Sequence, residues 1–129
     1  MAQEPARILV IDDEESIRRL LMDYAEDFDD LAVRASESGE AALEELERQS
    51  ADLCVADMRL PGMDGQAFII QAHDRGLCPR FLLHTGSLDF ALGRDLLERG
   101  VTEEDVFHKP CDMAKVVARI RAVLELPEG

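Results

Sequence analysis

Residues 57–65 read Asp-Met-Arg-Leu-Pro-Gly-Met-Asp-Gly and directly follow the short apolar run of residues 53–56. The apolar run predicts a buried strand, and the Pro-Gly pair predicts a tight turn soon after it. Asp57 therefore falls at a strand end, with its carboxylate available to a ligand. On its own, an acidic residue at such a place is more often a solvated loop residue or a helix cap. The rest of the chain decides between these interpretations.

The composition sets bounds on the function. With 129 residues, of which 47% are hydrophobic, the chain is long enough to bury a core as one domain. Acidic side chains outnumber basic ones by 28 to 14, and the resulting net charge of -14 argues against direct nucleic-acid binding. Three cysteines without a CxxC pair are typical of reduced cytosolic thiols. No apolar run approaches the roughly 20 residues of a spanning helix, so we expect a cytoplasmic protein without membrane insertion.

Five short apolar segments predict strands, and amphipathic segments between and after them predict five helices. The strands are expected at residues 8–11, 31–35, 53–56, 79–84 and 105–108. The apolar residues of the helices lie within residues 17–28, 42–46, 68–72, 90–97 and 113–124. This strict alternation predicts an α/β fold in which helices cover both faces of a doubly wound, five-stranded parallel sheet. We expect a single domain, residues 1–129, with its core in residues 7–125.

Polar side chains stand at the carboxyl ends of four of these strands: Asp12 and Asp13, Asp57, Thr85, and Lys109. In an open parallel sheet the ligand site lies beyond these ends, so the fold brings together residues that are far apart in sequence. Three carboxylates at one site repel each other, and a divalent cation relieves that repulsion. Oxygen ligands without Cys or His nearby favour Mg²⁺, with Mn²⁺ as a substitute. The sequence therefore predicts a magnesium site at this edge of the sheet.

Lys109 and Thr85 add an ammonium and a hydroxyl to the same pocket. Together with a metal cation, these groups suit a phosphoryl group in transfer, because its transition state spreads negative charge over the peripheral oxygens. Asp57 is then the nucleophile that forms an aspartyl phosphate. The simpler alternative is that the acids stabilise a helix N-terminus by about 0.3 to 1 kcal/mol each. That alternative explains Glu14 and Glu15 well, and it explains the two acids at the strand end less well.

With these residues in this order, the chain resembles the receiver domain of two-component response regulators over about residues 7–125. The family carries a segment of the form Asp-Met-x-Leu-Pro-x-Met-Asp-Gly, which residues 57–65 match. The resemblance implies the flavodoxin-like strand order 2-1-3-4-5. It also implies that Asp57 is the phosphoacceptor of a signalling domain, which is not an enzyme and catalyses only its own phosphorylation and dephosphorylation.

The resemblance implies roles for the neighbouring residues as well. Asp12 and Asp13 resemble the acidic pair that positions Mg²⁺. The backbone carbonyl of Arg59 would be a further metal ligand beside Asp57. Thr85, in a His-Thr-Gly sequence, resembles the switch hydroxyl of the family.

The last strand carries both a match and two departures. Lys109 resembles the phosphate-pairing lysine of the family, with a cis peptide bond expected before Pro110. Family members usually carry Tyr or Phe three residues before this lysine, where Val106 stands here. Phe107 should point to the opposite face of a regular strand, unless a register change in the preceding loop puts it in the aromatic role. Cys111 stands where the family often has Phe, and we interpret it as a small packed residue in preference to a thiol near the phosphate site.

The expected phosphoryl donor is a sensor histidine kinase or a histidine phosphotransfer protein, and the expected target is a downstream protein. The chain itself offers no relay histidine, since we interpret its three histidines as structural or solvated: His73, His84 and His108. Three alternatives stay open: a receiver excised from a hybrid kinase or larger regulator, an Asp-nucleophile phosphatase, and a pseudo-receiver that only binds partners. The phosphatase would need an acid at the place of Arg59. The pseudo-receiver is disfavoured because every expected site residue is present.

Overall fold

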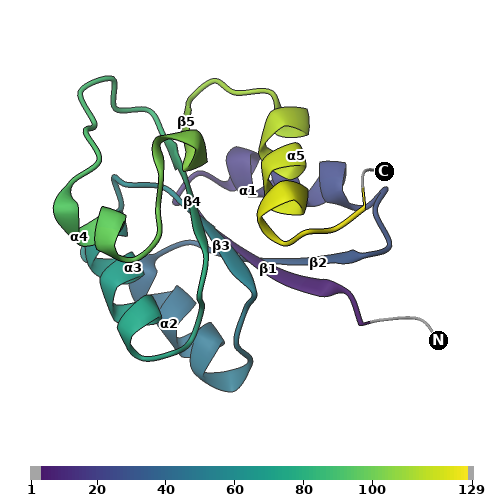
Figure 1. The fold of residues 1–129 in the computed structure, drawn as a ribbon, viewed down its shortest axis with the longest axis horizontal. Helices are drawn as coiled ribbons and strands as arrows, with labels where there is room; N and C mark the ends of the chain where they lie inside the picture. Colours follow the sequence, from purple (N-terminus) through teal and green to yellow (C-terminus); the bar gives the residue numbers. More distant parts are fainter. Residues whose placement is uncertain (1–3, 128–129) are drawn as a thin grey trace.

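The computed structural model describes residues 4–127, which form a parallel sheet between two layers of helices (Figure 1). The strands are β1 (Ala6–Ile11), β2 (Leu31–Ser36), β3 (Leu53–Ala56), β4 (Phe81–Thr85) and β5 (Val106–His108). The helices are α1 (Glu15–Ala25), α2 (Gly39–Arg48), α3 (Gly65–Asp74), α4 (Arg94–Glu98) and α5 (Met113–Val123), with a 3₁₀ turn at Glu103–Asp105. Within the described residues, no helix has both the length and the apolar character to cross a membrane.

The sheet has the order β2-β1-β3-β4-β5, and every neighbouring pair of strands is parallel. This confirms the doubly wound fold and the strand order that the resemblance implied. Because the strands all run the same way, their carboxyl ends lie along one edge of the sheet. The strand order reverses between β1 and β3, which is where sheets of this kind place their ligand site.

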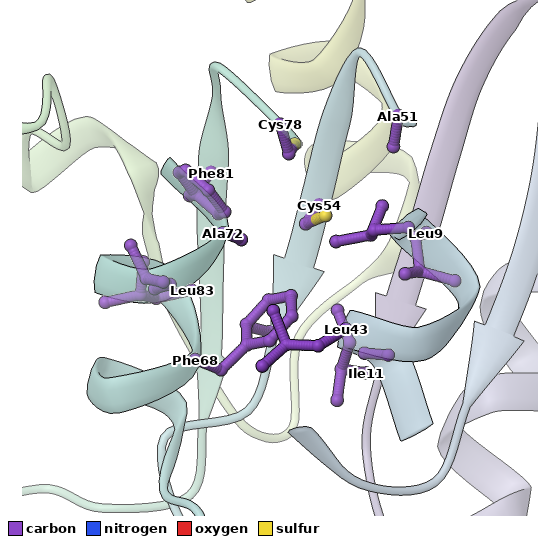
Figure 2. Packing of buried hydrophobic residues seen from close by; sticks show 14 of the residues in the cluster. Leu9, Ile11, Leu43, Ala51, Cys54, Phe68, Ala72, Cys78, Phe81 and Leu83 are labelled. Carbon is purple, nitrogen blue, oxygen red and sulfur yellow. The ribbon is translucent and has the colours of Figure 1, made fainter. Parts of the chain in front are cut away.

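Both faces of the sheet are covered, which explains why the strands are apolar without alternation. Helices α2, α3 and α4 lie on one face, and α1 and α5 lie on the other (Figure 1). The core under α2 and α3 contains Leu9, Ile11, Leu43, Phe68 and Leu83 (Figure 2). The core under α1 and α5 contains Ile8, Val10, Leu21, Leu82 and Val117. Successive residues of β1 thus serve opposite cores.

Side-chain caps set the start of two helices on the α2/α3 layer. Ser38 Oγ accepts a hydrogen bond from the Ala41 N–H at 3.1 Å, and Asp64 Oδ1 accepts one from the Ala67 N–H at 2.8 Å. Ser and Asp are favoured N-cap residues, and such a cap stabilises a helix by about 1 kcal/mol. Because Asp64 belongs to residues 57–65, its cap also fixes where the loop after Asp57 ends.

The fourth helix is shorter than the sequence predicts. The apolar residues within 90–97 have helical spacing, but α4 begins only after Gly93, which has no side chain to cap it. Phe90 and Leu92 lie in the preceding loop, and both pack against the cluster that contains Leu96. The prediction was therefore wrong about the helix start, because a loop can bury apolar side chains with the same spacing as a helix.

The boundaries of four strands also differ from the prediction. β1 begins at Ala6, two residues before the predicted start, and β2 ends at Ser36, one residue after the predicted end. β5 begins one residue late because Asp105 closes the 3₁₀ turn, where its carboxylate accepts a hydrogen bond from the Thr102 N–H at 2.8 Å. The same carboxylate is 2.8 Å from Arg119 Nε on α5. β4 begins at Phe81, two residues after the predicted start. β4 also ends one residue later than predicted, at Thr85, and no carboxyl end shifts by more than one residue.

Candidate functional site

The carboxyl ends of three strands bring charged side chains into contact. Asp12 follows β1, Asp57 follows β3 and Lys109 follows β5. The Lys109 ammonium lies between the two carboxylates, with Nζ 2.8 Å from Asp12 Oδ2 and 3.2 Å from Asp57 Oδ2. Both aspartates are buried, so solvent and salt screen this interaction less than they screen a surface pair. Parallel strands therefore bring together three residues that are separated by long stretches of sequence.

Four carboxylates gather at this site. One ligand atom from each of Asp12, Asp13, Glu14 and Asp57 lies within 4.8 Å of the others. Glu14 was not among the expected site residues, because the helix dipole already accounted for an acid at that position. Its carboxylate reaches the same ammonium, with Oε1 3.3 Å from Lys109 Nζ. One ammonium among four carboxylates leaves a deficit of positive charge, which a divalent cation with oxygen ligands would match.

Burial and charge have opposite effects on the pKa values of this ion pair. Burial raises the pKa of the Asp12 carboxyl, and hydrogen bonds from Lys109 and the Glu14 N–H offset part of that rise. Burial by itself would lower the pKa of Lys109, but the hydrogen bonds and charges of Asp12 and Asp57 raise it above its ordinary range. Lys109 therefore stays protonated at neutral pH, and the pocket keeps a fixed positive charge.

Thr85 and Arg59 lie beside this pocket. Thr85 is buried at the end of β4, and its Oγ1 accepts a hydrogen bond from the Ser87 N–H at 3.1 Å. Its carbonyl accepts one from the Lys109 N–H at 2.8 Å, which ties the two strand ends together. The Arg59 N–H donates to Asp57 Oδ1 at 3.2 Å, and the Arg59 guanidinium is 3.5 Å from Ser87 Oγ. Ser87 thus links both residues to the loop before α4, a contact that the sequence did not reveal.

The turn after Asp57 requires glycine at one position. A Cβ on Gly65 would lie 2.1 Å from the Asp57 carbonyl oxygen and 2.8 Å from the Met58 Cα, which is too close for any side chain. The Gly65 N–H also donates to the Met58 carbonyl at 3.1 Å. The first residue of α3 is therefore in direct contact with the backbone of Asp57. This contact packs the start of α3 against the backbone at Asp57 and Met58.

The sequence from residue 8 to residue 121 matches the family described as the response regulator receiver domain. The chain belongs to this family. The transcriptional regulatory protein CseB of Streptomyces coelicolor is 34% identical over 123 residues, which cover 94% of this chain and 50% of CseB. The alkaline phosphatase synthesis transcriptional regulatory protein PhoP of Bacillus subtilis is 37% identical over 125 residues, which cover 95% of this chain and 50% of PhoP. The receiver domain spans about half the length of these curated relatives.

Solved structures share the fold of this receiver domain. The chemotaxis response regulator CheY4 of Vibrio cholerae superposes with a TM-score of 0.78 at 20% identity, covering 92% of this chain and 98% of CheY4. A two-component response regulator from Clostridium difficile superposes with a TM-score of 0.80 at 20% identity, covering 93% of this chain and 96% of that chain. At such low identity the likeness establishes the fold alone.

The receiver domain departs from the family pattern at β5, as the sequence predicts. Val106 packs on the α2/α3 face of the sheet, and Phe107 packs on the α1/α5 face. The strand is regular, with Leu83 opposite Val106 and His84 opposite Phe107. The alternative in which a register change gives Phe107 the aromatic role is therefore wrong. The expected cis peptide bond joins Lys109 and Pro110.

The remaining singled-out residues are one cysteine and three histidines. Cys111 is half-buried against the α1/α5 core, which agrees with a small packed residue, and burial raises the pKa of its thiol. His73 Nδ1 lies 3.1 Å from Asp74 Oδ1, and His108 is exposed. His84 is buried, and its Nε2 has no hydrogen-bond partner within residues 4–127. Burial lowers the pKa of His84, which favours the neutral form of its ring.

Proposed function

We propose that this receiver domain accepts a phosphoryl group on Asp57, in an Mg²⁺-dependent transfer from a phosphohistidine of a sensor histidine kinase or histidine phosphotransfer protein. The strongest support comes from Lys109, whose ammonium lies 3.2 Å from Asp57 Oδ2 and 2.8 Å from Asp12 Oδ2. A fixed cation beside a buried carboxylate stabilises the negative charge of a phosphoryl group as it arrives. Of the acids that pair with Lys109, Asp57 is the one that begins the matched segment of residues 57–65.

The acidic cluster fits Mg²⁺ as the metal. Its ligand atoms are all carboxylate oxygens that lie within 4.8 Å of one another, and Mg²⁺ prefers oxygen ligands. Asp12, Asp13 and Asp57 would hold the ion, with the backbone carbonyl of Arg59 as a further ligand. When bound there, Mg²⁺ supplies positive charge to the oxygens of the phosphoryl group in transfer.

The protein's own groups account for the rest of the reaction. A carboxylate oxygen of Asp57 forms a bond to phosphorus while the phosphorus–nitrogen bond of the donor breaks, and the imidazole nitrogen keeps the electron pair. Lys109 pairs with the negative phosphoryl oxygens. Thr85 Oγ1 accepts its hydrogen bond from Ser87, so its own proton is available for a phosphoryl oxygen. This new hydrogen bond would move the loop that contains Ser87.

The phosphorylated state would change a surface formed by α4, β5 and α5, to which a downstream protein binds. Ser87 ties Thr85 to the loop of residues 86–93, which leads directly into α4. Family members usually carry an aromatic residue at the position of Val106. Without it, the movement of Thr85 and its loop would transmit the effect of phosphorylation to the surface formed by α4, β5 and α5.

We further propose that residues 1–129 form one cytoplasmic receiver unit, with residues 7–125 as its core. The matched relatives named as transcriptional regulators are about twice as long, which supports a role within a larger regulator. The net charge of -14 opposes direct contact of this unit with DNA. An Asp-nucleophile phosphatase gains no support, because Arg59 occupies the position where that enzyme would need an acid.

Phosphorylation by acetyl phosphate tests the assignment of Asp57. We expect Mg²⁺-dependent labelling of the wild type, seen as a phosphoryl mass increase, and no labelling of Asp57→Asn. Asp64→Asn is the matched control, because it removes the same charge seven residues away while Asn preserves the helix cap. Undiminished labelling of Asp57→Asn would refute Asp57 as the acceptor.

A further inference from the structure

The Lys109 ammonium has three protons to donate and no capacity to accept. Three carboxylates surround it: Asp12 Oδ2 at 2.8 Å, Asp57 Oδ2 at 3.2 Å and Glu14 Oε1 at 3.3 Å. The contacts to Asp57 and Glu14 are hydrogen bonds, and the contact to Asp12 is an ion pair. A phosphoryl oxygen that binds Lys109 therefore competes with these three carboxylates for the ammonium.

The three carboxylates differ in how firmly they are held. The side chains of Asp12 and Asp57 are only 2% and 6% exposed, whereas that of Glu14 is 57% exposed. Asp12 also accepts from the Glu14 N–H at 2.9 Å, and Asp57 accepts from the Arg59 N–H at 3.2 Å. Within residues 4–127 the Glu14 carboxylate has Lys109 as its one partner. Glu14 is the least costly of the three to release, because water can solvate it at once.

We propose that the Glu14 carboxylate is a placeholder for the phosphoryl group: it accepts a hydrogen bond from Lys109 in the resting domain and leaves when phosphorylation supplies a stronger anion. This inference rests on the proposed function of Asp57. Glu14 is then a positioning residue that acts through Lys109. It lowers the affinity of the pocket for anions, both by competing for the ammonium and by like-charge repulsion at the pocket mouth.

The local structure gives the Glu14 side chain no competing task. Glu14 is the N-cap residue of α1, but its side chain makes no cap hydrogen bond. The N–H groups of Ile17 and Arg18 bond to its backbone carbonyl, which any residue supplies. Substitution of the side chain therefore leaves the start of α1 intact. The alternative role is that of a metal ligand, since Glu14 belongs to the acidic cluster.

Binding of beryllofluoride, an analogue of the phosphoryl group, tests the proposal at saturating Mg²⁺. The chain has no Trp, so NMR titration is the appropriate measurement. We expect Glu14→Gln to bind beryllofluoride roughly fivefold more tightly than the wild type, and Glu14→Ala to bind at least as tightly as Glu14→Gln. The matched control is Glu15→Gln, which removes the same charge from the next residue and breaks only an exposed pair with Arg19. This control should bind as the wild type does.

Two further measurements separate the possible outcomes. Without metal or analogue, the side-chain NMR signals of Lys109 should shift in Glu14→Gln and stay in place in Glu15→Gln. Equal beryllofluoride affinity of Glu14→Gln and Glu15→Gln would overturn the proposal. Mg²⁺ binding that is weakened in Glu14→Gln but not in Glu15→Gln would identify Glu14 as a metal ligand instead. If the wild type fails to bind beryllofluoride, the proposed function fails, while the Lys109 signals still report whether Glu14 occupies the ammonium.

Discussion

Two largely buried cations, Lys109 and Arg121, sit in different settings on this fold. The Lys109 side chain is 14% exposed and lies among the carboxylates at the carboxyl end of the sheet. The Arg121 side chain on α5 is 9% exposed and forms two hydrogen bonds to Asp30, at 2.8 and 2.7 Å. Arg121 Nε also donates to the Pro127 carbonyl at 2.8 Å, and its guanidinium lies 5.2 Å from the centre of the Phe28 ring.

The comparison shows how the choice of cation suits the task. The planar guanidinium of Arg121 matches one carboxylate in a fixed two-point geometry, so it holds the end of α5 against the segment before β2. The ammonium of Lys109 is a compact charge whose three donors can rotate toward any acceptor. This freedom suits the proposed exchange of a carboxylate for a phosphoryl oxygen. In this domain Arg121 forms the structural contact, and Lys109 is the cation for which we propose an exchange of partners.

The largest expected effect comes from replacing the lysine. Lys109→Ala should lower the rate of phosphorylation by acetyl phosphate roughly a hundredfold or more, as loss of a charge-stabilising donor does in enzymes. Lys109→Arg should fail to restore the rate, because the longer fork does not fit among three carboxylates. Rates are compared after circular dichroism has shown that both variants are folded. A rate for Lys109→Arg near that of the wild type would contradict the claim that an arginine cannot replace the lysine at this site.

A smaller effect, on stability, is expected at the other cation. Arg121→Ala should lower the free energy of unfolding by about 2 kcal/mol, less than for a fully buried pair because the Asp30 side chain is 40% exposed. Arg121→Lys should recover less than half of that loss, since an ammonium cannot form the two-point contact. Urea unfolding measures both changes. Phosphorylation of Asp57 should keep its wild-type rate, and a slowed rate would show that the two regions are coupled.

The smallest effect is expected at the ion pair of Arg99 and Asp74, whose acid is more exposed than the acid that pairs with Arg121. Hydrogen bonds from Arg99, with a smaller contribution from His73, lower the pKa of Asp74 from 3.8 to about 2. A lowered pKa adds stability above pH 3.8 and loses it as the pH falls toward 2. Unfolding midpoints of the wild type and Asp74→Asn should therefore differ slightly at neutral pH and converge on acidification. A difference that grows in acid would contradict this sign.

The sequence predicted the parts of the fold that local signals control. Continuous apolar runs gave the strands, and Ser38 and Asp64 marked two helix starts correctly, because a cap depends on residues within one turn. The start of α4 was missed, because Phe90 and Leu92 pack against the core from a loop. The spacing of apolar residues indicates which side chains are buried, but it does not show whether the backbone is helical. Glu14 was missed for a related reason. The helix dipole explained its presence, and nothing local indicated where its carboxylate would lie.

The sequence by itself determined the succession of strands and helices along the chain. It also determined the placement of four site residues at strand ends: Asp12, Asp57, Thr85 and Lys109. Parallel strands end at one edge of a sheet, so that placement already implied a shared site. Only the tertiary structure decided that Glu14 shares an ammonium with two aspartates, across 95 residues of sequence from Lys109. It also decided that Val106, and not Phe107, faces α2 and α3. Such contacts depend on strand register and side-chain rotamers, which are settled when distant segments pack and not by the residues next in sequence.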